Sequence, residues 1–192
     1  MNAPVDHATR NRNRWMLVGI FVLFFGGLVL AGLLRFSGWR PEGSKARGEF
    51  LQPTADLREL TPTLADGSPY HWNPKERTWR ILAMTERCDT TNAAACERLL
   101  TDLDKVWQLM GKDADRVHVL WVGALPAKGP RPATLRVLRP TDALRDGLPR
   151  SHDAKGMPVY VLDPNGFVVL RYAPGSDPGD VRTDLSRLLK VN

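Results

Sequence analysis

The 192-residue sequence predicts an α/β fold, a mixed sheet flanked by helices, preceded by one N-terminal transmembrane helix. Three observations support this prediction. A continuous apolar run occupies residues 15–34. Apolar runs of strand type at 78–84 and 116–125 enclose a helical apolar stripe at 93–110, which indicates a strand–helix–strand unit. Residues 157–172 contain two strand-like runs around an Asn-Gly turn, so antiparallel pairing joins parallel pairing in one sheet.

The apolar run reads WMLVGIFVLFFGGLVLAGLL and contains twenty residues without a charge. As a helix it is long enough to cross a hydrocarbon layer of about 30 Å. A cleaved signal peptide is the alternative, but its apolar region has about 7–15 residues and is followed by small residues at a cleavage site. Here AGLLRFSGWR follows. We therefore predict a retained single-pass anchor at residues 15–34.

The anchor divides the chain into four predicted parts. Residues 1–14 are a short tail with three arginines, which we place in the cytoplasm because short basic segments are retained there. Residues 35–50 mix Gly, Pro, Ser and charge without a hydrophobic period and form a tether. Residues 51–192 then fold in the periplasm, from an anchor in a bacterial inner membrane. In that oxidising compartment a cysteine pair can persist as a disulfide.

The individual elements follow from local patterns. Asp66-Gly67 is a turn dipeptide that predicts a hairpin within residues 55–72. The run TWRILAM at 78–84 is too short for a stable helix and predicts a buried strand. The helix predicted at 93–110 has an apolar stripe, which consists of Leu99, Leu100, Leu103, Val106, Trp107 and Met110.

The second half of the domain is read in the same way. Gly111 ends the first helix, and RVHVLWVGAL at 116–125 is the strongest strand pattern. The short TLRVL segment at 134–138 fits either a strand or the start of a small helix. A terminal helix begins at Pro178 with Asp177 as its cap. Its inward stripe comprises Val181, Leu185, Leu188 and Leu189.

Both cysteines lie in ERCDTTNAAACERLL, between a predicted strand and a predicted helix. On one helix, Cys88 and Cys96 would be separated by about 12 Å, more than the roughly 7 Å that a disulfide allows between Cα atoms. A bond therefore requires Cys88 to lie off the helix, with residues 89–92 folding back over its first turn. These four residues, Asp, Thr, Thr and Asn, all favour the start of a helix.

Three interpretations of the pair remain open: a redox-active dithiol, a Cu(I) site formed by two thiolates, and a static disulfide or a lapsed site. Two cysteines and scattered histidines do not provide a zinc site. His118 is expected to pack within its strand, and His71 to be exposed. The net charge of +6 is dispersed along the chain and no nucleic-acid-binding motif is present. The sequence also has no catalytic triad, phosphate loop or metalloprotease motif.

The segments TWRILAM, DADRVHVLWV, VYVLDPNGFVVLRY and DLSRLLK, in this order, resemble membrane-anchored thioredoxin-like proteins of bacteria that are associated with cytochrome c oxidase assembly, the Sco/SenC-related group. The resemblance implies a thioredoxin-like domain. In the Sco branch it implies copper bound by a CxxxC pair and a distant histidine, with delivery or reduction at the copper centre of the oxidase. Cys88 and Cys96 match the two motif cysteines by context, with four additional residues between them.

The resemblance also concerns residues near the last strand pair. The resemblance implies a histidine ligand five residues before the position of Tyr160. Lys155 occupies that position here. His152, three residues further back, is therefore the candidate third copper ligand. Thioredoxin-like proteins have a cis proline before the strand that faces the cysteines, and Met157-Pro158 resembles that context. We therefore expect Pro158 to be cis and to pack beside the cysteines. A trans proline at the first residue of a strand is the alternative.

Together, the sequence predicts a periplasmic accessory protein in cytochrome c oxidase assembly that handles copper or thiols. Its expected partners are the membrane, through residues 15–34, and respiratory oxidase subunits or other assembly factors. A membrane-tethered thiol–disulfide oxidoreductase and a non-redox binding scaffold are the alternatives. The sequence does not decide whether the protein is an enzyme.

Overall fold

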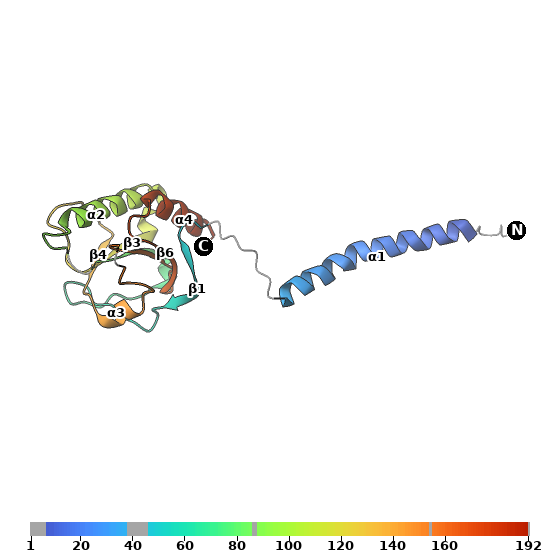
Figure 1. The fold of residues 1–192 in the computed structure, drawn as a ribbon, viewed down its shortest axis with the longest axis horizontal. Helices are drawn as coiled ribbons and strands as arrows, with labels where there is room; N and C mark the ends of the chain where they lie inside the picture. The colour runs from blue at the N-terminus through green and yellow to red at the C-terminus, as the bar shows by residue number, and fades with distance from the viewer. Residues whose placement is uncertain (1–6, 38–45, 86–87, 154, 192) are drawn as a thin grey trace. The chain divides into compact units, whose positions relative to one another are not determined.

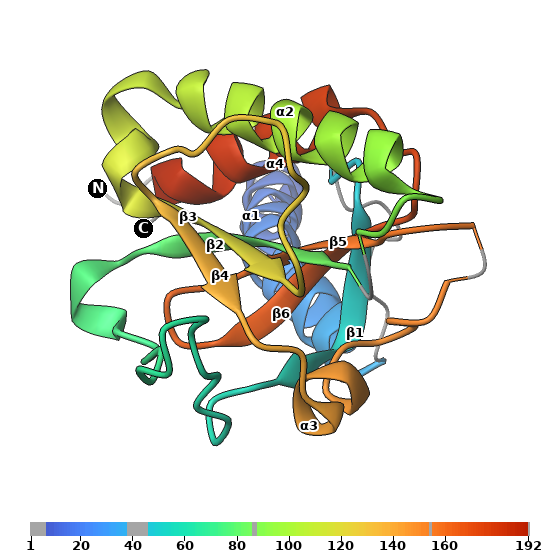
Figure 2. The same cartoon turned by 90° about the vertical axis from the view of Figure 1, so that its left-hand side faces the viewer.

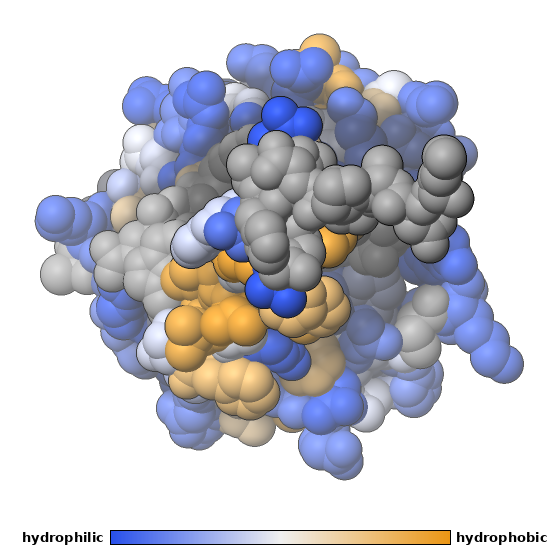
Figure 3. Space-filling view, turned by 90° about the vertical axis from the view of Figure 1, so that its right-hand side faces the viewer, coloured by the Kyte–Doolittle hydropathy of each residue, from blue (hydrophilic) through white to orange (hydrophobic). Residues whose placement is uncertain are grey.

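The computed structural model describes residues 7–37, 46–85, 88–153 and 155–191 and has two compact units, which we treat separately (Figure 1). The first unit contains α1 (His7–Phe36). Its segment Asn11–Phe36 has a mean hydropathy of 2.7 and is long and apolar enough to cross a membrane. The apolar side chains of α1 form much of the orange surface in Figure 3. Residues 1–6 of the predicted tail and 38–45 of the predicted tether lie outside the described residues.

The second unit contains a six-stranded mixed sheet with the order β1-β6-β5-β2-β3-β4. The strands are β1 (Glu49–Asp56), β2 (Trp79–Met84), β3 (Val117–Val122), β4 (Leu135–Leu138), β5 (Val159–Leu162) and β6 (Phe167–Tyr172). β2 pairs in parallel with β3 and antiparallel with β5. β3 and β4 are parallel, whereas β6 is antiparallel to both β5 and β1. The mixed sheet predicted from the sequence is confirmed.

Helices cover both faces of this sheet. α2 (Ala93–Gln108) and α4 (Pro178–Val191) lie on one face, and α3 (Asp142–Asp146) lies on the other (Figure 2). Two short 3-10 helices, η1 (Pro74–Glu76) and η2 (Gly111–Arg116), complete the elements. The buried side chains accordingly form two clusters, one between the sheet and α2 with α4, and one between the sheet and α3 with the 57–72 segment.

The central strand β2 is buried along its whole length, as its apolar sequence predicts for a strand covered on both faces. Its one charged residue, Arg80, is only 1% exposed. The guanidinium lies over the rings of Tyr70 and Trp72. It donates hydrogen bonds to the Tyr70 hydroxyl at 3.0 Å and to the carbonyls of Asp163 and Pro164 at 3.0 and 2.9 Å. These hydrogen bonds and ring contacts compensate the free-energy cost of removing the Arg80 guanidinium from water.

Both predicted long helices are confirmed, α4 with its predicted start and α2 with an end two residues before the predicted Met110. The last residue of α2 is Gln108, and Gly111 follows with a φ of +57°, a conformation that glycine adopts without strain. α4 begins at Pro178, and the Asp177 carboxylate accepts a hydrogen bond from the Gly179 amide at 2.8 Å. Asp177 is therefore the predicted cap.

The structure differs from the predictions in the first part of the domain. β1 begins at Glu49, within the stretch predicted as tether, because its pairing with β6 defines it rather than a local pattern. The predicted hairpin at 55–72 is a tight turn at Gly67 with a single bridge between Thr63 and Pro69. Of the two alternatives given for the segment at 134–138, the structure has the strand, β4.

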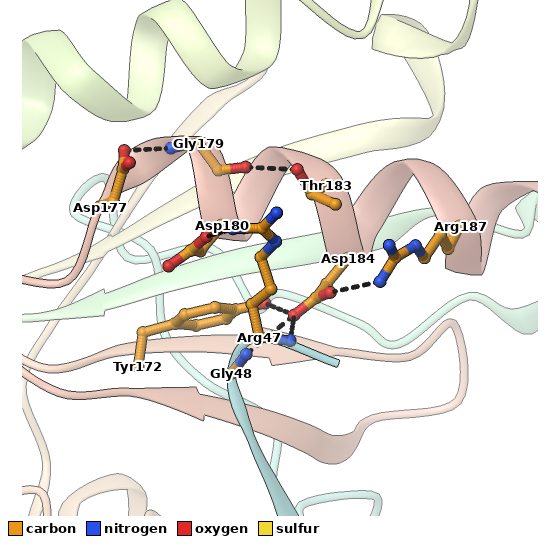
Figure 4. A network of polar contacts seen from close by, with 9 residues as sticks. All are labelled: Arg47, Gly48, Tyr172, Asp177, Gly179, Asp180, Thr183, Asp184 and Arg187. Carbon is orange, nitrogen blue, oxygen red and sulfur yellow. Dashed lines mark hydrogen bonds and ion pairs between the residues drawn. The ribbon is translucent and has the colours of Figure 1, made fainter. Parts of the chain in front are cut away.

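A buried carboxylate fastens the start of β1 to the C-terminal helix (Figure 4). Asp184 of α4 is 2% exposed and accepts hydrogen bonds from the amides of Arg47 and Gly48, at 2.7 and 2.9 Å, and from the Tyr172 hydroxyl at 2.9 Å. Burial, and next the negative charge of Asp184, raise the pKa of Tyr172 well above its usual value. A Cβ at Gly48 would lie 2.6 Å from the Tyr172 ring, so glycine is required there.

We predict that Asp184→Asn lowers the free energy of unfolding by about 2–3 kcal/mol, because the three hydrogen bonds to its buried Oδ2 lose the assistance of the carboxylate charge. Chemical denaturation of the domain measures this loss. The matched control is Asp180→Asn, because Asp180 forms an ion pair with an Arg47 side chain that is 60% exposed. The control should lose less than about 1 kcal/mol. Equal losses in the two variants would contradict the prediction.

Candidate functional site

The candidate site lies at the carboxyl end of β2. Met84 is the last residue of the strand, and the next residue, Thr85, donates hydrogen bonds to the Val122 carbonyl from both its amide and its hydroxyl. Val122 is the last residue of β3. The chain is therefore held at the ends of two central strands just before it reaches Cys88.

The segment between the cysteines folds back, as predicted. The Asp89 carboxylate accepts a hydrogen bond from the Thr91 amide at 2.9 Å, and the Asp89 carbonyl accepts one from the Asn92 amide at 3.3 Å. α2 then begins at Ala93, with Asn92 in the capping position. The Asn92 side chain does not cap the helix. Its Oδ1 lies 3.8 Å from the Sγ of Cys96 instead.

Cys88 and Cys96 form a disulfide with a Cα–Cα distance of 5.9 Å. Because Cys88 precedes the helix, the separation of about 12 Å expected for two residues on one helix does not arise. The two sulfur positions differ in exposure. Cys96 is fully buried in the core beneath α2, and Cys88 is partly buried. Cys88 is therefore the more accessible residue of the pair, although it also packs against the core cluster.

A third sulfur atom adjoins the disulfide. The Sδ of Met157, just before β5, lies 3.7 Å from the Sγ of Cys96. A disulfide sulfur carries no proton, so this is a contact between two polarisable atoms and not a hydrogen bond. The sequence analysis did not assign Met157 to the site. Its position directly before Pro158 was the available signal, because that proline was already expected to face the cysteines.

The expectation of a cis bond at Pro158 is wrong. Among the described residues the cis peptide bond is Gln52-Pro53, so Met157-Pro158 is trans. The Pro158 carbonyl accepts a hydrogen bond from the Met84 amide at 3.2 Å. The extended chain at Pro158 thus continues the pairing of β2 with β5, in which Ala83 lies opposite Val159. Pro158 is a strand-entry proline, the alternative considered above.

His152 lies exposed in the loop between α3 and β5. In the described part of the chain, no three His, Cys, Asp or Glu residues are grouped closely enough to hold a metal ion. The structure therefore does not bring His152 to Cys88 and Cys96. Its role as a copper ligand stays a prediction.

His118 belongs to the packing of the sheet, as predicted. It is a partly buried residue of β3, and its Nδ1 lies 2.9 Å from the Tyr70 hydroxyl. Burial, followed by the charges of Arg136 and Arg80, lowers the pKa of His118 from 6.5 to about 4. His118 is therefore uncharged at neutral pH. His71 is exposed, also as predicted.

The fold agrees with a match to a known family. Residues 79–192 match the family described as "Transmembrane-like, thioredoxin-like, C-terminal domain". The chain belongs to this family. This membership confirms the predicted thioredoxin-like α/β domain. Together with α1, it supports single-pass membrane anchoring of the domain.

Solved structures share the thioredoxin-like fold. Trgpx in its apo form has a TM-score of 0.50 and 14% identity, with 70% of this chain and 95% of that chain covered. BsSco, described as a Sco-family cytochrome c oxidase assembly protein with a disulfide switch, has a TM-score of 0.49 and 14% identity over 69% and 92% of the two chains. Copper-bound ScoI from Bradyrhizobium japonicum has a TM-score of 0.43 and 19% identity over 66% and 95%. No curated protein matches the sequence. At these identities the likeness concerns the fold alone, and a relation to Sco proteins is distant.

The lowered pKa of His118 predicts a pH dependence of stability. Between about pH 6.5 and pH 4 the unfolded chain binds a proton at His118 that the folded domain does not, so stability falls as the pH falls through this window. We expect about 1–2 kcal/mol from this residue after allowance for its partial exposure. Denaturation of His118→Gln at several pH values should show a shallower decline than the wild type. His71→Gln is the control and should decline as the wild type does; an unchanged slope in His118→Gln would refute the assignment.

Proposed function

We propose that this protein is a membrane-anchored accessory protein that acts on a partner protein through the redox state of Cys88 and Cys96. One observation carries the proposal. The bond joins a partly buried cysteine, Cys88, to a fully buried one, Cys96, in the first turn of a helix. It lies at the carboxyl end of the central strand of a thioredoxin-like sheet. A disulfide that only linked the loop to the helix would not need one of its two cysteines to be more accessible than the other.

The arrangement supports an ordered exchange. A partner thiolate attacks the Sγ of Cys88, the Cys88–Cys96 bond breaks, and Cys96 leaves as a thiolate. A second partner thiol, as its thiolate, then attacks the mixed disulfide at the partner sulfur. The partner is released with its own disulfide, and Cys88 leaves as a thiolate that takes up a proton. The overall reaction transfers two electrons from the partner dithiol to this protein, and the reverse sequence reduces a partner disulfide.

The position of Cys96 assists its role as leaving group. The amide of Cys96 is already bonded to the Asn92 carbonyl at 3.0 Å, so the residue belongs to the first turn of α2. The positive end of the helix dipole stabilises negative charge within that turn. The Sδ of Met157 and the Oδ1 of Asn92 lie 3.7 and 3.8 Å from the same sulfur.

The process we propose is assembly of cytochrome c oxidase, with oxidase subunits or other assembly factors as partners. The support is the sequence resemblance of the strand, hairpin and terminal helix segments to Sco/SenC-related proteins. The proposed orientation places residues 51–192 in the periplasm, where a disulfide is maintained. A general oxidoreductase and a non-redox scaffold are distinguished from this role by the experiments below.

Single-cysteine variants of the full chain test the exchange. We expect Cys96→Ser to form a mixed disulfide with glutathione at Cys88, and Cys88→Ser to form at least about tenfold less because Cys96 is buried. Mass spectrometry after alkylation measures both adducts. For the wild type we expect a reduction potential above about −300 mV in glutathione buffers. A lower potential, or no adduct in Cys96→Ser, would identify the bond as purely structural.

A deletion strain tests the process. We expect its cytochrome c oxidase activity to fall, and a plasmid with the wild-type chain, but not with Cys88→Ser, to restore it. Restoration by both plasmids would favour the non-redox scaffold. Unchanged oxidase activity in the deletion strain, with the exchange reaction present, would favour a general oxidoreductase.

Binding of Cu(I) is a second candidate function, favoured by the third sulfur. The cysteine sulfurs and the Met157 thioether, which lies 3.7 Å from the Sγ of Cys96, are soft donors that suit Cu(I) once the disulfide is reduced. Cys88, Cys96 and Met157 would hold the ion. A bound Cu(I) would supply a metal for transfer to a partner. His152 is the alternative third ligand.

Titration of the reduced full chain with Cu(I) against a chromogenic chelator tests this candidate. We expect one ion per chain, no binding in Cys88→Ser, and about tenfold weaker binding in Met157→Leu, which keeps the side-chain volume without the sulfur. His152→Ala should bind as the wild type does. A loss in His152→Ala with none in Met157→Leu would transfer the ligand role to the histidine. No binding at sub-micromolar concentration would remove the copper function.

A further inference from the structure

An apolar groove lies at the opposite edge of the sheet from β4, between β1, β6 and α4. Its volume is about 220 Å³, and its apolar lining consists of Ala46, Phe50, Val169, Leu170 and Leu188. Phe50 is 41% exposed. In the described residues of the second unit, Phe50 and Leu109 are the exposed large hydrophobic side chains, and Phe50 lines this groove.

A β-bulge in β6 creates the groove. Leu170 pairs with both Phe50 and Val161, and Val168 pairs with Ala55, which leaves Val169 without a residue opposite. The additional residue reverses the alternation of side chains along the strand. Val168 packs in the cluster below the sheet, whereas both Val169 and Leu170 pack toward α4. Two consecutive apolar side chains therefore face one side, and α4 covers them only in part.

One arginine side chain lines the same groove, and a second arginine is next in sequence to a lining residue. Arg187 contributes to its lining, and Arg47 follows directly after Ala46. Their side chains remain 51% and 60% exposed although they form ion pairs with Asp184 and Asp180 (Figure 4). Guanidinium groups beside apolar side chains suit the interfacial layer of a bilayer, where lipid phosphates lie next to acyl chains.

The chain that leads to the groove adds two further arguments. Residues 35–47 contain four basic residues and one acidic residue, a composition that anionic lipid attracts. Nine residues, 37–45, connect the last residue of α1 to Ala46. Even fully extended, this connection reaches only about 35 Å. Ala46 is thus the first residue of the groove and also the described residue of the domain with the shortest covalent path to the membrane helix.

We propose that this groove, independently of the cysteine chemistry, is a contact surface for the anionic bilayer that holds the anchor. Acyl chains of the outer layer contact Phe50, Val169 and Leu188, and phosphate groups contact Arg47 and Arg187. A polypeptide strand added to the free edge of β1 is a less suitable occupant. Pro53 has no amide hydrogen to donate, and the β1–β6 register is interrupted between Phe50 and Ala55.

Photo-crosslinking of the full chain in nanodiscs tests the proposal. p-Benzoylphenylalanine is placed at position 50 or, as the matched control, at position 109, where Leu109 is 60% exposed at the end of α2. In nanodiscs of phosphatidylglycerol and phosphatidylcholine, we expect at least about fivefold more lipid adduct from position 50. The yield should fall in phosphatidylcholine alone and in the Arg47→Gln, Arg187→Gln double variant.

Three results would overturn the proposal: equal lipid yields from positions 50 and 109, adducts at position 50 with a second copy of the chain, and adducts there with another polypeptide. A cooperative chemical unfolding transition like that of the wild type establishes that each variant is folded, and thiol counting establishes that the Cys88–Cys96 disulfide is retained. Because the cysteines are unchanged in these variants, failure of the lipid contact and failure of the exchange reaction are distinguished.

Discussion

Burial of β2 on both faces is the constraint on which the rest of the domain depends. All six of its side chains are buried, including the charged Arg80. The strand therefore needs a partner on each edge, a helical layer on one side, and a polar lining for the guanidinium on the other, which Tyr70 and two carbonyl groups provide. At the carboxyl end of β2, Thr85 is hydrogen-bonded to the last residue of β3. Cys88 follows three residues later and is bonded to Cys96 in the first turn of α2.

Elements with a local pattern could be predicted, and elements defined by distant partners could not. The stripes of α2 and α4, the apolar run of β2 and the Asn-Gly turn before β6 each carry their signal within a few residues. β1 reads EFLQPTAD, with a proline and no clear alternation. It is a strand because Glu49 and Phe50 pair with Arg171 and Leu170, more than a hundred residues away. α3 has five residues, too few to show a stripe.

The site shows the same division. The separation of eight positions between Cys88 and Cys96, combined with helix geometry, shows that a bond requires residues 89–92 to fold back, and the structure has that turn. Helix geometry and sequence spacing do not predict contacts between residues on different strands of the sheet. The trans bond at Pro158 and the sulfur contact of Met157 both follow from the pairing of β5 with β2, which no local pattern records.

The Asp184 carboxylate also determines where mechanical load enters the domain. The amides of Arg47 and Gly48, the first part of the domain to be reached from the anchor, are bonded to Asp184 on α4, and β1 then pairs with β6. Tension along the chain, from a diffusing anchor or a bound partner, is therefore borne first by α4 and the β1–β6 pairing. In the strand order, β6 and β5 separate β1 from β2, which leads to the cysteines. α4 also packs against α2, the helix that carries Cys96, so helix packing connects the point where load enters the domain with the disulfide.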